Sequence, residues 1–354
     1  MKLEDLGYNN IFEKFRTDNN LDDFEIGRVV EEHKERYKVR TTKGEFEAEI
    51  IGNMRFTAKN REDFPAVGDW VALSTFNANF AIIHKILPRY SLIKRQAVAH
   101  FGEVQIIAAN IDYAFIIQAI DRDFSINRIE RYLTICNSSK VSPIIVLSKV
   151  DLINEKQVSE ILAKIKVRIK NIPVIAISNE SLDGYDELKA LIKKEKTYCM
   201  LGSSGVGKST LLNNLSGKTI MRTDTISLST NKGRHVTSHR ELIMLENGGI
   251  LIDNPGMREV GIADSTDGLE ITFDTIIGLS KNCKFKDCTH TNEIGCSVLE
   301  AVEKGEIDEA SYENYLKMER EKTHFESSIA ERRKKDKEFG KFMKNYKKGM
   351  KKKY

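Results

Sequence analysis

The chain has 354 residues, which at roughly 150 residues per domain predicts two or three domains with buried cores. Hydrophobic residues make up 40% of it and charged residues 31%, with a net charge of +4, a composition typical of soluble globular proteins that excludes a chain disordered throughout. No apolar run reaches 18 residues, and acids stand where a signal peptide would be basic and then apolar. We therefore expect a cytoplasmic protein without a membrane segment or a targeting signal.

The N-terminal part of the chain is dominated by short strands. Residues 1–24 contain one short helical stretch and a polar break, and we treat them as an extension. Residues 25–98 alternate strands with turns and have no long helix, which favours a small β-barrel: an OB-fold, the common nucleic-acid-binding type, or an SH3-like barrel as the alternative. Four basic residues follow the last strand: Arg89, Lys94, Arg95 and His100. We therefore expect a basic, RNA-binding face at the exit of the barrel.

Residues 99–275 change to strands and helices in alternation. Apolar strands are predicted at 113–120, 143–147 and 198–201, with amphipathic helices between them. This pattern is typical of a parallel sheet covered by helices on both faces, and such sheets bind ligands at the carboxyl ends of their strands. The chemistry of the chain is therefore expected where these strands end.

The segment after the strand at 198–201 fits the phosphate-binding pattern GxxxxGK(S/T), and a helix begins within it. Its glycines allow the backbone to wrap around phosphates, whose charge meets amide N–H groups and the positive end of the helix. Lys208 is expected to reach the β and γ phosphates, and the Ser209 hydroxyl to bind Mg²⁺. Nine nucleotide-binding residues are predicted here: Gly202, Ser203, Ser204, Gly205, Val206, Gly207, Lys208, Ser209 and Thr210.

A second motif that is expected to lie near the phosphates follows further along the chain. A predicted buried strand ends in Asp253, the first residue of a DxxG motif. Asp253 is expected to hold Mg²⁺ through water, and the Gly256 amide to sense the γ phosphate. Residues 233–239 form a polar stretch between the two motifs, in which Thr237 is the predicted switch hydroxyl on Mg²⁺ and Ser238 the alternative.

Two segments upstream of the P-loop predict the base. Residues 148–151 have the form of an (N/T)KxD motif with serine in place of asparagine. The Asp151 carboxylate accepts two hydrogen bonds from guanine that adenine cannot donate together, and the Lys149 stem lies along the base. Ser148 is shorter than asparagine, so we expect a looser pocket that still selects guanine. The predicted base-binding residues are Ser148, Lys149, Val150, Asp151, Ile177, Ser178 and Asn179, the last three offering a backbone amide to guanine O6.

These motifs appear in an unusual order, because the base-binding segments precede the phosphate-binding ones. Termini of α/β domains lie at the surface and often close together, so joining them and cutting elsewhere preserves the site. We therefore predict a circularly permuted GTPase domain. Met257 follows Gly256 where many GTPases place a glutamine that orients water, a task that a thioether cannot perform. We expect slow intrinsic hydrolysis, completed by His235 or by a partner.

Three cysteines and a histidine lie within fourteen residues near the C-terminus: Cys283, Cys288, His290 and Cys296. A closed Cys₃His set supplies the four tetrahedral ligands of Zn²⁺ and leaves no position for a reactive water, so we predict a structural zinc domain over 276–325. Cys136 and Cys199 lie within helix and strand patterns and are read as core residues. Residues 331–354 hold 12 basic and 3 acidic side chains, so the tail over 326–354 is predicted either to contact nucleic acid or to form a solvated helical end.

Taken together, these motifs resemble the circularly permuted small-ribosomal-subunit GTPases of the RsgA (YjeQ/YloQ) family, over residues 25 to 325. The resemblance rests on Pro88-Arg89, the permuted motifs, Gly233-Arg234-His235, the segment 253–259 and the Cys₃His set. It implies an OB-fold, a central GTPase domain and a C-terminal zinc domain that act on the 30S subunit and its 16S rRNA, late in maturation near the decoding centre. By the same resemblance His235 matches a histidine proposed to help hydrolysis. Ser148 and Val236 depart from the residues usual in the family.

The sequence therefore predicts a multidomain GTPase that converts GTP to GDP with stimulation by the small subunit, its nucleotide state gating RNA binding. A monomer is the default expectation. Two alternatives remain at this point: a P-loop kinase for a small metabolite, and an RNA-binding assembly factor that uses guanine nucleotide only structurally.

Overall fold

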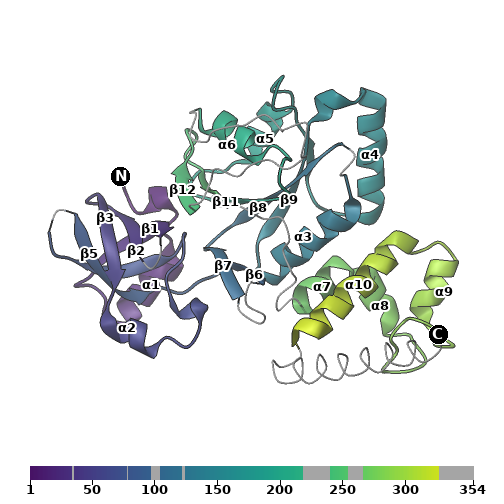
Figure 1. The fold of residues 1–354 in the computed structure, drawn as a ribbon, viewed down its shortest axis with the longest axis horizontal. Helices are drawn as coiled ribbons and strands as arrows, with labels where there is room; N and C mark the ends of the chain where they lie inside the picture. Colours follow the sequence, from purple (N-terminus) through teal and green to yellow (C-terminus); the bar gives the residue numbers. More distant parts are fainter. Residues whose placement is uncertain are drawn as a thin grey trace, which may run out of the picture.

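A computed structural model describes residues 1–33, 36–77, 79–96, 104–121, 124–217, 240–253 and 266–326. Figure 1 shows three parts in chain order: a barrel, a sheet with helices on both sides, and a group of helices toward the C-terminus. Over these residues, no helix combines the length and apolar character needed to cross a membrane.

The first part is a five-stranded barrel, as predicted. Its strands are β1 (Glu25–His33), β2 (Arg36–Thr41), β3 (Glu45–Ile50), β4 (Trp70–Thr75) and β5 (Phe80–Ile86), with the short helices α2 (Gly52–Thr57) and η2 (Arg61–Asp63) between β3 and β4. The strands pair in the order β1-β2-β3-β5-β4, and β4 returns to β1. Of these barrel pairs, β3–β5 is parallel and the others are antiparallel. This order is that of the OB-fold and excludes the SH3-like alternative.

The N-terminal residues pack against the barrel as part of its core. Helices η1 (Glu4–Leu6) and α1 (Asn10–Asp18) place Leu6 and Phe12 beside Trp70, and all three side chains are fully buried. Asn9 caps α1 by accepting a hydrogen bond from the Ile11 amide at 2.9 Å. Sequence reasoning had missed this core, because the partner of the helix lies on β4, far along the chain.

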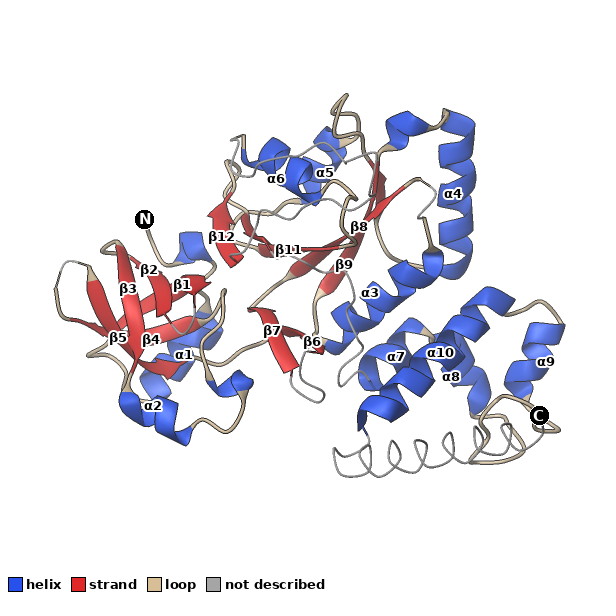
Figure 2. Ribbon diagram, in the orientation of Figure 1, coloured by secondary structure: helices blue, strands red, loops and turns tan. Residues whose placement is uncertain are grey.

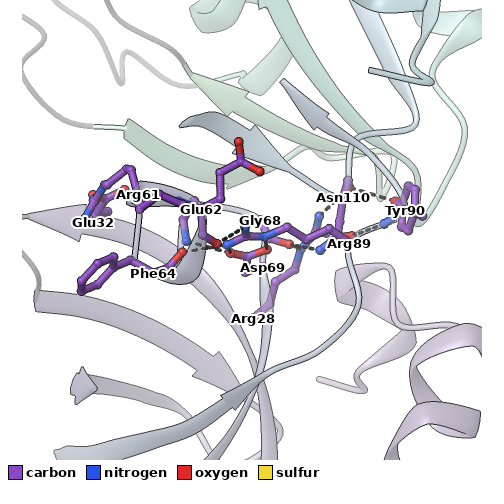
Figure 3. Close-up of polar contacts among 12 residues, drawn as sticks. Arg28, Glu32, Arg61, Glu62, Phe64, Gly68, Asp69, Arg89, Tyr90 and Asn110 are labelled. Carbon is purple, nitrogen blue, oxygen red and sulfur yellow. Dashed lines mark hydrogen bonds and ion pairs between the residues drawn. The ribbon is translucent and has the colours of Figure 1, made fainter. Parts of the chain in front are cut away.

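The barrel meets the second part at a buried polar cluster (Figure 3). The Arg28 guanidinium donates to three carbonyl oxygens: Leu6 at 2.5 Å, Gly68 at 3.1 Å and Asn110 at 3.1 Å. Gly68 has φ +95°, and a Cβ there would collide with the Ala109 carbonyl, so only glycine permits this close approach. A single side chain from β1 therefore joins the N-terminal segment, the barrel and the start of the sheet domain.

Two of the four residues of the expected basic exit face are paired with acids inside the chain. The side chain of Arg89 is only 13% exposed and donates to both carboxylate oxygens of Asp69, at 2.8 and 2.6 Å. Lys94 pairs with Glu62 at 2.9 Å. It lies on β6 (Leu92–Gln96), which pairs antiparallel with β7 (Val104–Ala109), a small ribbon that the sequence did not reveal. The position of His100 lies outside the described residues, and so does the side chain of Arg95.

The second part is the predicted parallel sheet. Its strands are β8 (Tyr113–Ala119), β9 (Ser142–Ser148), β10 (Val174–Ala176), β11 (Thr197–Leu201), β12 (Arg240–Met244) and β13 (Ile250–Asp253). They run in the order β10-β9-β8-β11-β13-β12, parallel except for the edge strand β12. Strand β12 also pairs with β1, so the barrel and the domain share one continuous eleven-stranded sheet.

Helices cover both faces of this sheet, because successive strand residues point to opposite sides. On one face, α3 (Ile126–Ser138) and α4 (Glu155–Arg168) pack on residues such as Ile145, Leu147 and Cys199. On the other, α5 (Tyr185–Leu191) and α6 (Lys208–Ser216) pack on Val146, Ile175 and Met200. Figure 1 shows α3 and α6 on opposite sides of the strands.

The third part is helical and packs on α3 (Figure 2). It contains α7 (Thr266–Thr272), α8 (Asp274–Ser280), α9 (Ser297–Glu303) and α10 (Glu309–Glu326). Phe273, Val298 and Met318 form its core together with the buried Cys296. The basic tail after residue 326 lies outside the described part of the chain. The three-part architecture confirms the predicted fold class.

Candidate functional site

The loop that joins β11 to α6 requires glycine where the motif places it. Gly202 has φ +159° and a Cβ there would collide with the Ile117 carbonyl, while Gly207 has φ +93° and packs against the Asn179 side chain. Gly205, at φ +82°, has open space where its Cβ would be. The backbone can therefore follow a path around a phosphate that side chains would block.

Lys208 lies across the start of this loop. Its Nζ donates to the carbonyl of Gly202 at 2.8 Å and to the carbonyl of Ser203 at 2.5 Å. An ammonium carries three donors, so two bonds to the backbone fix the direction of the charge. Lys208 is also the first residue of α6, where amide N–H groups and the helix dipole favour an anion.

Two of the side chains predicted to bind Mg²⁺ follow neighbouring strands of the sheet. Asp253 ends β13, which runs parallel and adjacent to β11, and the carboxylate side chain is buried. Ser209 follows at the start of α6, half-buried. Hydroxyl and carboxylate oxygens are the donors that Mg²⁺ prefers, so the residues fit this ion. The predicted residues His235, Thr237 and Gly256 lie outside the described part of the chain.

The two segments that the sequence predicts to bind the base are hydrogen-bonded directly to the P-loop. The buried Ser148 hydroxyl donates to the Val206 carbonyl at 2.6 Å, and the Asn179 amide donates to the Gly207 carbonyl at 3.1 Å. Ser148 therefore performs a tethering task that its short side chain can reach. The two segments also touch one another, because the Val150 amide donates to the Ile177 carbonyl at 3.3 Å.

Lys149 and Asp151 follow the end of β9. Lys149 has φ +62°, an uncommon conformation for a side chain of this size, and its Nζ pairs with Asp121 Oδ2 at 3.1 Å. Asp151 is exposed, in the middle of the short helix η3 (Val150–Leu152). Ser178 is buried and its hydroxyl accepts from the amides of Glu180 and Ser181 at 3.2 and 3.1 Å, which shapes the loop after β10.

Sequence reasoning missed three residues around these segments. Tyr185 donates to Asn179 Oδ1 at 2.7 Å, and Asn214 donates to the Tyr185 hydroxyl at 2.9 Å and to the Asn179 carbonyl at 3.2 Å. Asp121 pairs with Lys149. All three lie outside the motifs, so their spacing in the sequence gave no signal.

The Cys₃His set comes together in the third part of the fold. The ligand atoms of Cys283, Cys288, His290 and Cys296 all lie within 4.8 Å of one another. Cys283 Sγ is 3.8 Å from Cys296 Sγ and 3.6 Å from His290 Nδ1, which is 3.4 Å from Cys296 Sγ. With bonds of about 2.3 Å to sulfur and about 2.0 Å to nitrogen, a tetrahedron around Zn²⁺ has edges of about 3.5–3.8 Å. The geometry therefore fits a zinc ion.

The protonation of these groups also suits a metal. Burial lowers the pKa of His290, which favours the neutral imidazole that a metal needs. Burial acts to raise the pKa of Cys283, but the backbone N–H groups of Ser297 and Val298 lower it overall. Burial raises the pKa of Cys288 to about 11, so a bound ion would have to displace that proton. In contrast, Cys136 and Cys199 are fully buried in the sheet domain, and burial raises the pKa of each thiol.

Removal of the metal is expected to unfold the third part of the fold. Cys296 belongs to the apolar core of that part, and Cys283 and Cys288 pack against it, so Cys296→Ala loses a predicted ligand and a core contact together. We expect about one Zn²⁺ per chain by elemental analysis, lost in Cys296→Ala, with fast amide exchange across α8 and α9. The matched control Cys136→Ala should keep the metal. Full metal content in Cys296→Ala would contradict the zinc assignment.

The comparisons with known proteins now decide the family. The family model described as RsgA GTPase matches residues 86–263. The small ribosomal subunit biogenesis GTPase RsgA 1 of Bacteroides thetaiotaomicron is 40% identical, with 92% of this chain and 91% of that protein covered. The chain belongs to the RsgA GTPase family. The recognition made from the motifs alone is thereby confirmed.

Further relatives and solved structures support the same family assignment. RsgA 2 of Lactiplantibacillus plantarum is 43% identical over 84% of both chains. The crystal structure of YjeQ from Thermotoga maritima matches with a TM-score of 0.61 at 26% identity, over 83% of this chain and 96% of that one. YloQ, described as a circularly permuted GTPase, has the same fold, with a TM-score of 0.61 at 24% identity over 86% of this chain and 97% of its own. A second family model, ABC transporter, matches residues 185–354, a stretch that contains the P-loop.

Proposed function

We propose that this protein hydrolyses GTP to GDP and phosphate, that the small ribosomal subunit stimulates the reaction, and that the protein assists late maturation of that subunit. The observation that carries the proposal is the tether of both base-binding segments to the P-loop, through Ser148 and Asn179. A base and its phosphates need a fixed separation, and these two bonds hold it although the motif order is permuted. The names of the relatives support the choice of partner.

Each predicted residue then has a task. The loop from Gly202 to Thr210 surrounds the phosphates, while residues 148–151 and 177–179 hold guanine. Ser209 and Thr237 bind Mg²⁺, with Asp253 acting through water; the ion, when bound, neutralises charge on the β and γ phosphates. The Gly256 amide senses the γ phosphate, and His235 helps hydrolysis. Because Met257 cannot orient the attacking water, a group supplied by the subunit performs that task. The Cys₃His zinc is structural.

The proposed partner is RNA-rich, and three parts of the chain suit it. The OB-fold, the zinc-containing part and the basic tail of residues 331–354 would contact 16S rRNA, the tail through its net charge of +9 from 12 basic and 3 acidic residues. GTP would favour the bound state and GDP the released one, which requires a different subunit affinity for each nucleotide state. The protein would act as a cytoplasmic monomer.

GTP hydrolysis by the purified protein, alone and with isolated small subunits, tests the proposal. Large subunits and ATP serve as controls. We expect slow release of phosphate from the protein alone, strong stimulation by small subunits and little by large ones. A fast rate without subunits, or equal stimulation by both subunits, would contradict it.

Nucleotide selectivity is expected to change in Asp151→Asn. Guanine presents two N–H donors to the carboxylate, and an asparagine amide would set its own donors against one of them. We expect GTP affinity to fall about 10- to 100-fold and XTP, which has a carbonyl in place of the amine, to gain. Competition of each nucleotide against fluorescent GDP measures both. Asp186→Asn, an exposed aspartate of α5, is the matched control; an unchanged GTP to XTP preference in Asp151→Asn would remove Asp151 from the base site.

A further inference from the structure

The loop after β10 faces guanine O6 in the proposed site and offers three backbone amides. The Ile177 amide donates to the Leu147 carbonyl at 2.7 Å, and the Ser178 amide donates to the Asp183 carbonyl at 3.1 Å. Among the residues that the structure describes, the Asn179 amide has no acceptor. This amide can therefore bind a carbonyl oxygen of a ligand without breaking a bond within the chain.

The side chain of Asn179 ties this loop to the P-loop. Its Nδ2 donates to the Gly207 carbonyl at 3.1 Å, and its Oδ1 accepts from the Tyr185 hydroxyl at 2.7 Å. Gly207 has φ +93°, and a Cβ there would lie 2.4 Å from Nδ2, so this close approach requires glycine. Because both ends of the side-chain amide are bonded, its orientation is fixed, and the backbone of Asn179 is held with it.

Tyr185 and Asn214 hold Asn179 from two helices. Tyr185 is the first residue of α5 and is only 3% exposed. Asn214 of α6 donates through Nδ2 to the Tyr185 hydroxyl at 2.9 Å and to the Asn179 carbonyl at 3.2 Å. Burial raises the pKa of Tyr185 to about 12, so the phenol keeps the proton that it donates to Asn179. The three residues thus form a closed triangle in which each one contacts the other two.

The start of α5 is itself fixed to the sheet. Gly184 precedes Tyr185 with φ +76°, and a Cβ there would lie 2.1 Å from the Ala176 carbonyl of β10. Helices α5 and α6 lie side by side on one face of the sheet (Figure 1). Because the motif order is permuted, the chain runs from Asn179 through α5 and β11 directly to Gly207, and the hydrogen bond between these two residues closes that segment. The distance between the loop after β10 and the P-loop is therefore fixed within one continuous stretch of chain.

We propose that Tyr185 and Asn214 are positioning residues for guanine, which keep the Asn179 amide at a fixed place beside O6. The inference rests on the proposed GTP site and names residues that determine its selectivity. A fixed donor favours the carbonyl oxygen of guanine and opposes the amine that adenine carries at the same position, because two donors would then face each other. Without these two side chains the amide can withdraw, so the gain with guanine and the penalty with adenine both become smaller.

Binding of GDP and of 6-thio-GDP, each in competition with fluorescent GDP, isolates this contact. The two ligands differ only in the atom at position 6, where sulfur accepts hydrogen bonds more weakly than oxygen. We expect the unaltered protein to prefer GDP about tenfold, and Tyr185→Phe and Asn214→Ala to reduce that preference to about two- to threefold by weakening GDP more than 6-thio-GDP. The preference for GDP over XDP, which depends on Asp151, should stay unchanged.

Tyr198→Phe is the matched control. Tyr198 is buried like Tyr185, but its hydroxyl donates to the Leu191 carbonyl and accepts from the Lys193 amide, at the other end of α5. Its loss should leave both nucleotide preferences as they are. Tyr185→Phe should unfold at nearly the same temperature as Tyr198→Phe. Asn214→Ala, at a half-buried helix position that alanine suits, gives the same test with little risk to the fold.

A double-mutant cycle tests whether the effect passes through Asn179. Asn179→Ala removes the side-chain acceptor and keeps the backbone amide, so Tyr185→Phe should weaken GDP binding less in that background than in the unaltered chain. Equal losses of GDP and 6-thio-GDP in Tyr185→Phe and Asn214→Ala, or strictly additive losses in the cycle, would overturn the inference. If the unaltered protein binds no GDP, or Lys208→Ala binds it equally well, the proposed GTP site itself fails, which is a separate outcome.

Discussion

GTP hydrolysis is expected to fall by on the order of a hundredfold or more when Lys208 is replaced by alanine. The ammonium is held by the carbonyls of Gly202 and Ser203 and therefore stays at the phosphate end of the loop. Alanine supplies neither the charge nor the contacts that orient it, while the helix that it starts would still form. Phosphate release with and without small subunits measures the loss.

The matched control for this change is Lys189→Ala, an exposed lysine of α5 in the same domain. It removes the same charge from the chain, and its hydrolysis should stay within about twofold, as for most exposed substitutions. The two variants should unfold at nearly the same temperature. Hydrolysis that persists in Lys208→Ala, with the fold intact, would show that the loop does not bind the reacting phosphates.

The second large effect is expected on stability, in Arg28→Met. Methionine fills much of the same volume but leaves the carbonyls of Leu6, Gly68 and Asn110 buried without this donor. Buried groups that lose charged partners cost about 3–5 kcal/mol in total. The guanidinium also lies over the ring of Trp70, 5.7 Å from its centroid, a contact that is lost as well. Urea unfolding followed by the fluorescence of Trp70, the single tryptophan, reports directly on this core.

Arg40→Met is the comparison for this variant. Arg40 lies on the neighbouring strand β2 and pairs with Glu45 at the barrel surface, so its loss should cost about 1 kcal/mol or less. Arg28→Lys keeps the charge but cannot reach three carbonyls at once, and it should fall between the two. Equal unfolding midpoints for Arg28→Met and Arg40→Met would show that the buried cluster is not what fixes the barrel.

The nucleotide site was predictable because its information is local. The P-loop, the segments 148–151 and 177–179 and Asp253 each follow a strand, and parallel strands bring their carboxyl ends to one edge. The Cys₃His cluster was predictable for the same reason, since its four residues lie close in sequence. The contacts that these segments make with one another were not predictable, because the residues involved lie far apart in the sequence. The hydrogen bond from Ser148 to Val206 spans 58 residues, and neither segment indicates it.

The N-terminal segment and the basic residues after the barrel show most clearly what the sequence could not predict. Arg28 looks like any strand arginine in the sequence, yet its partners lie 22, 40 and 82 residues away. Arg89 was expected to face RNA because it is basic, but its guanidinium forms an ion pair with the buried Asp69. The composition gives the number of charged side chains, whereas only the fold shows which of them form ion pairs within the chain.

The pairing of β1 with β12 determines how the protein can be divided. The two strands meet through Glu31 with Glu241 and Glu32 with Arg240, and β12 is the outermost strand of the nucleotide-binding sheet. If the chain were cut after the barrel, β12 would present its free N–H and C=O groups to solvent, an arrangement that invites pairing with another copy. We therefore expect the isolated GTPase domain to self-associate through that edge. In the full chain, the pairing of β1 with β12 prevents this aggregation.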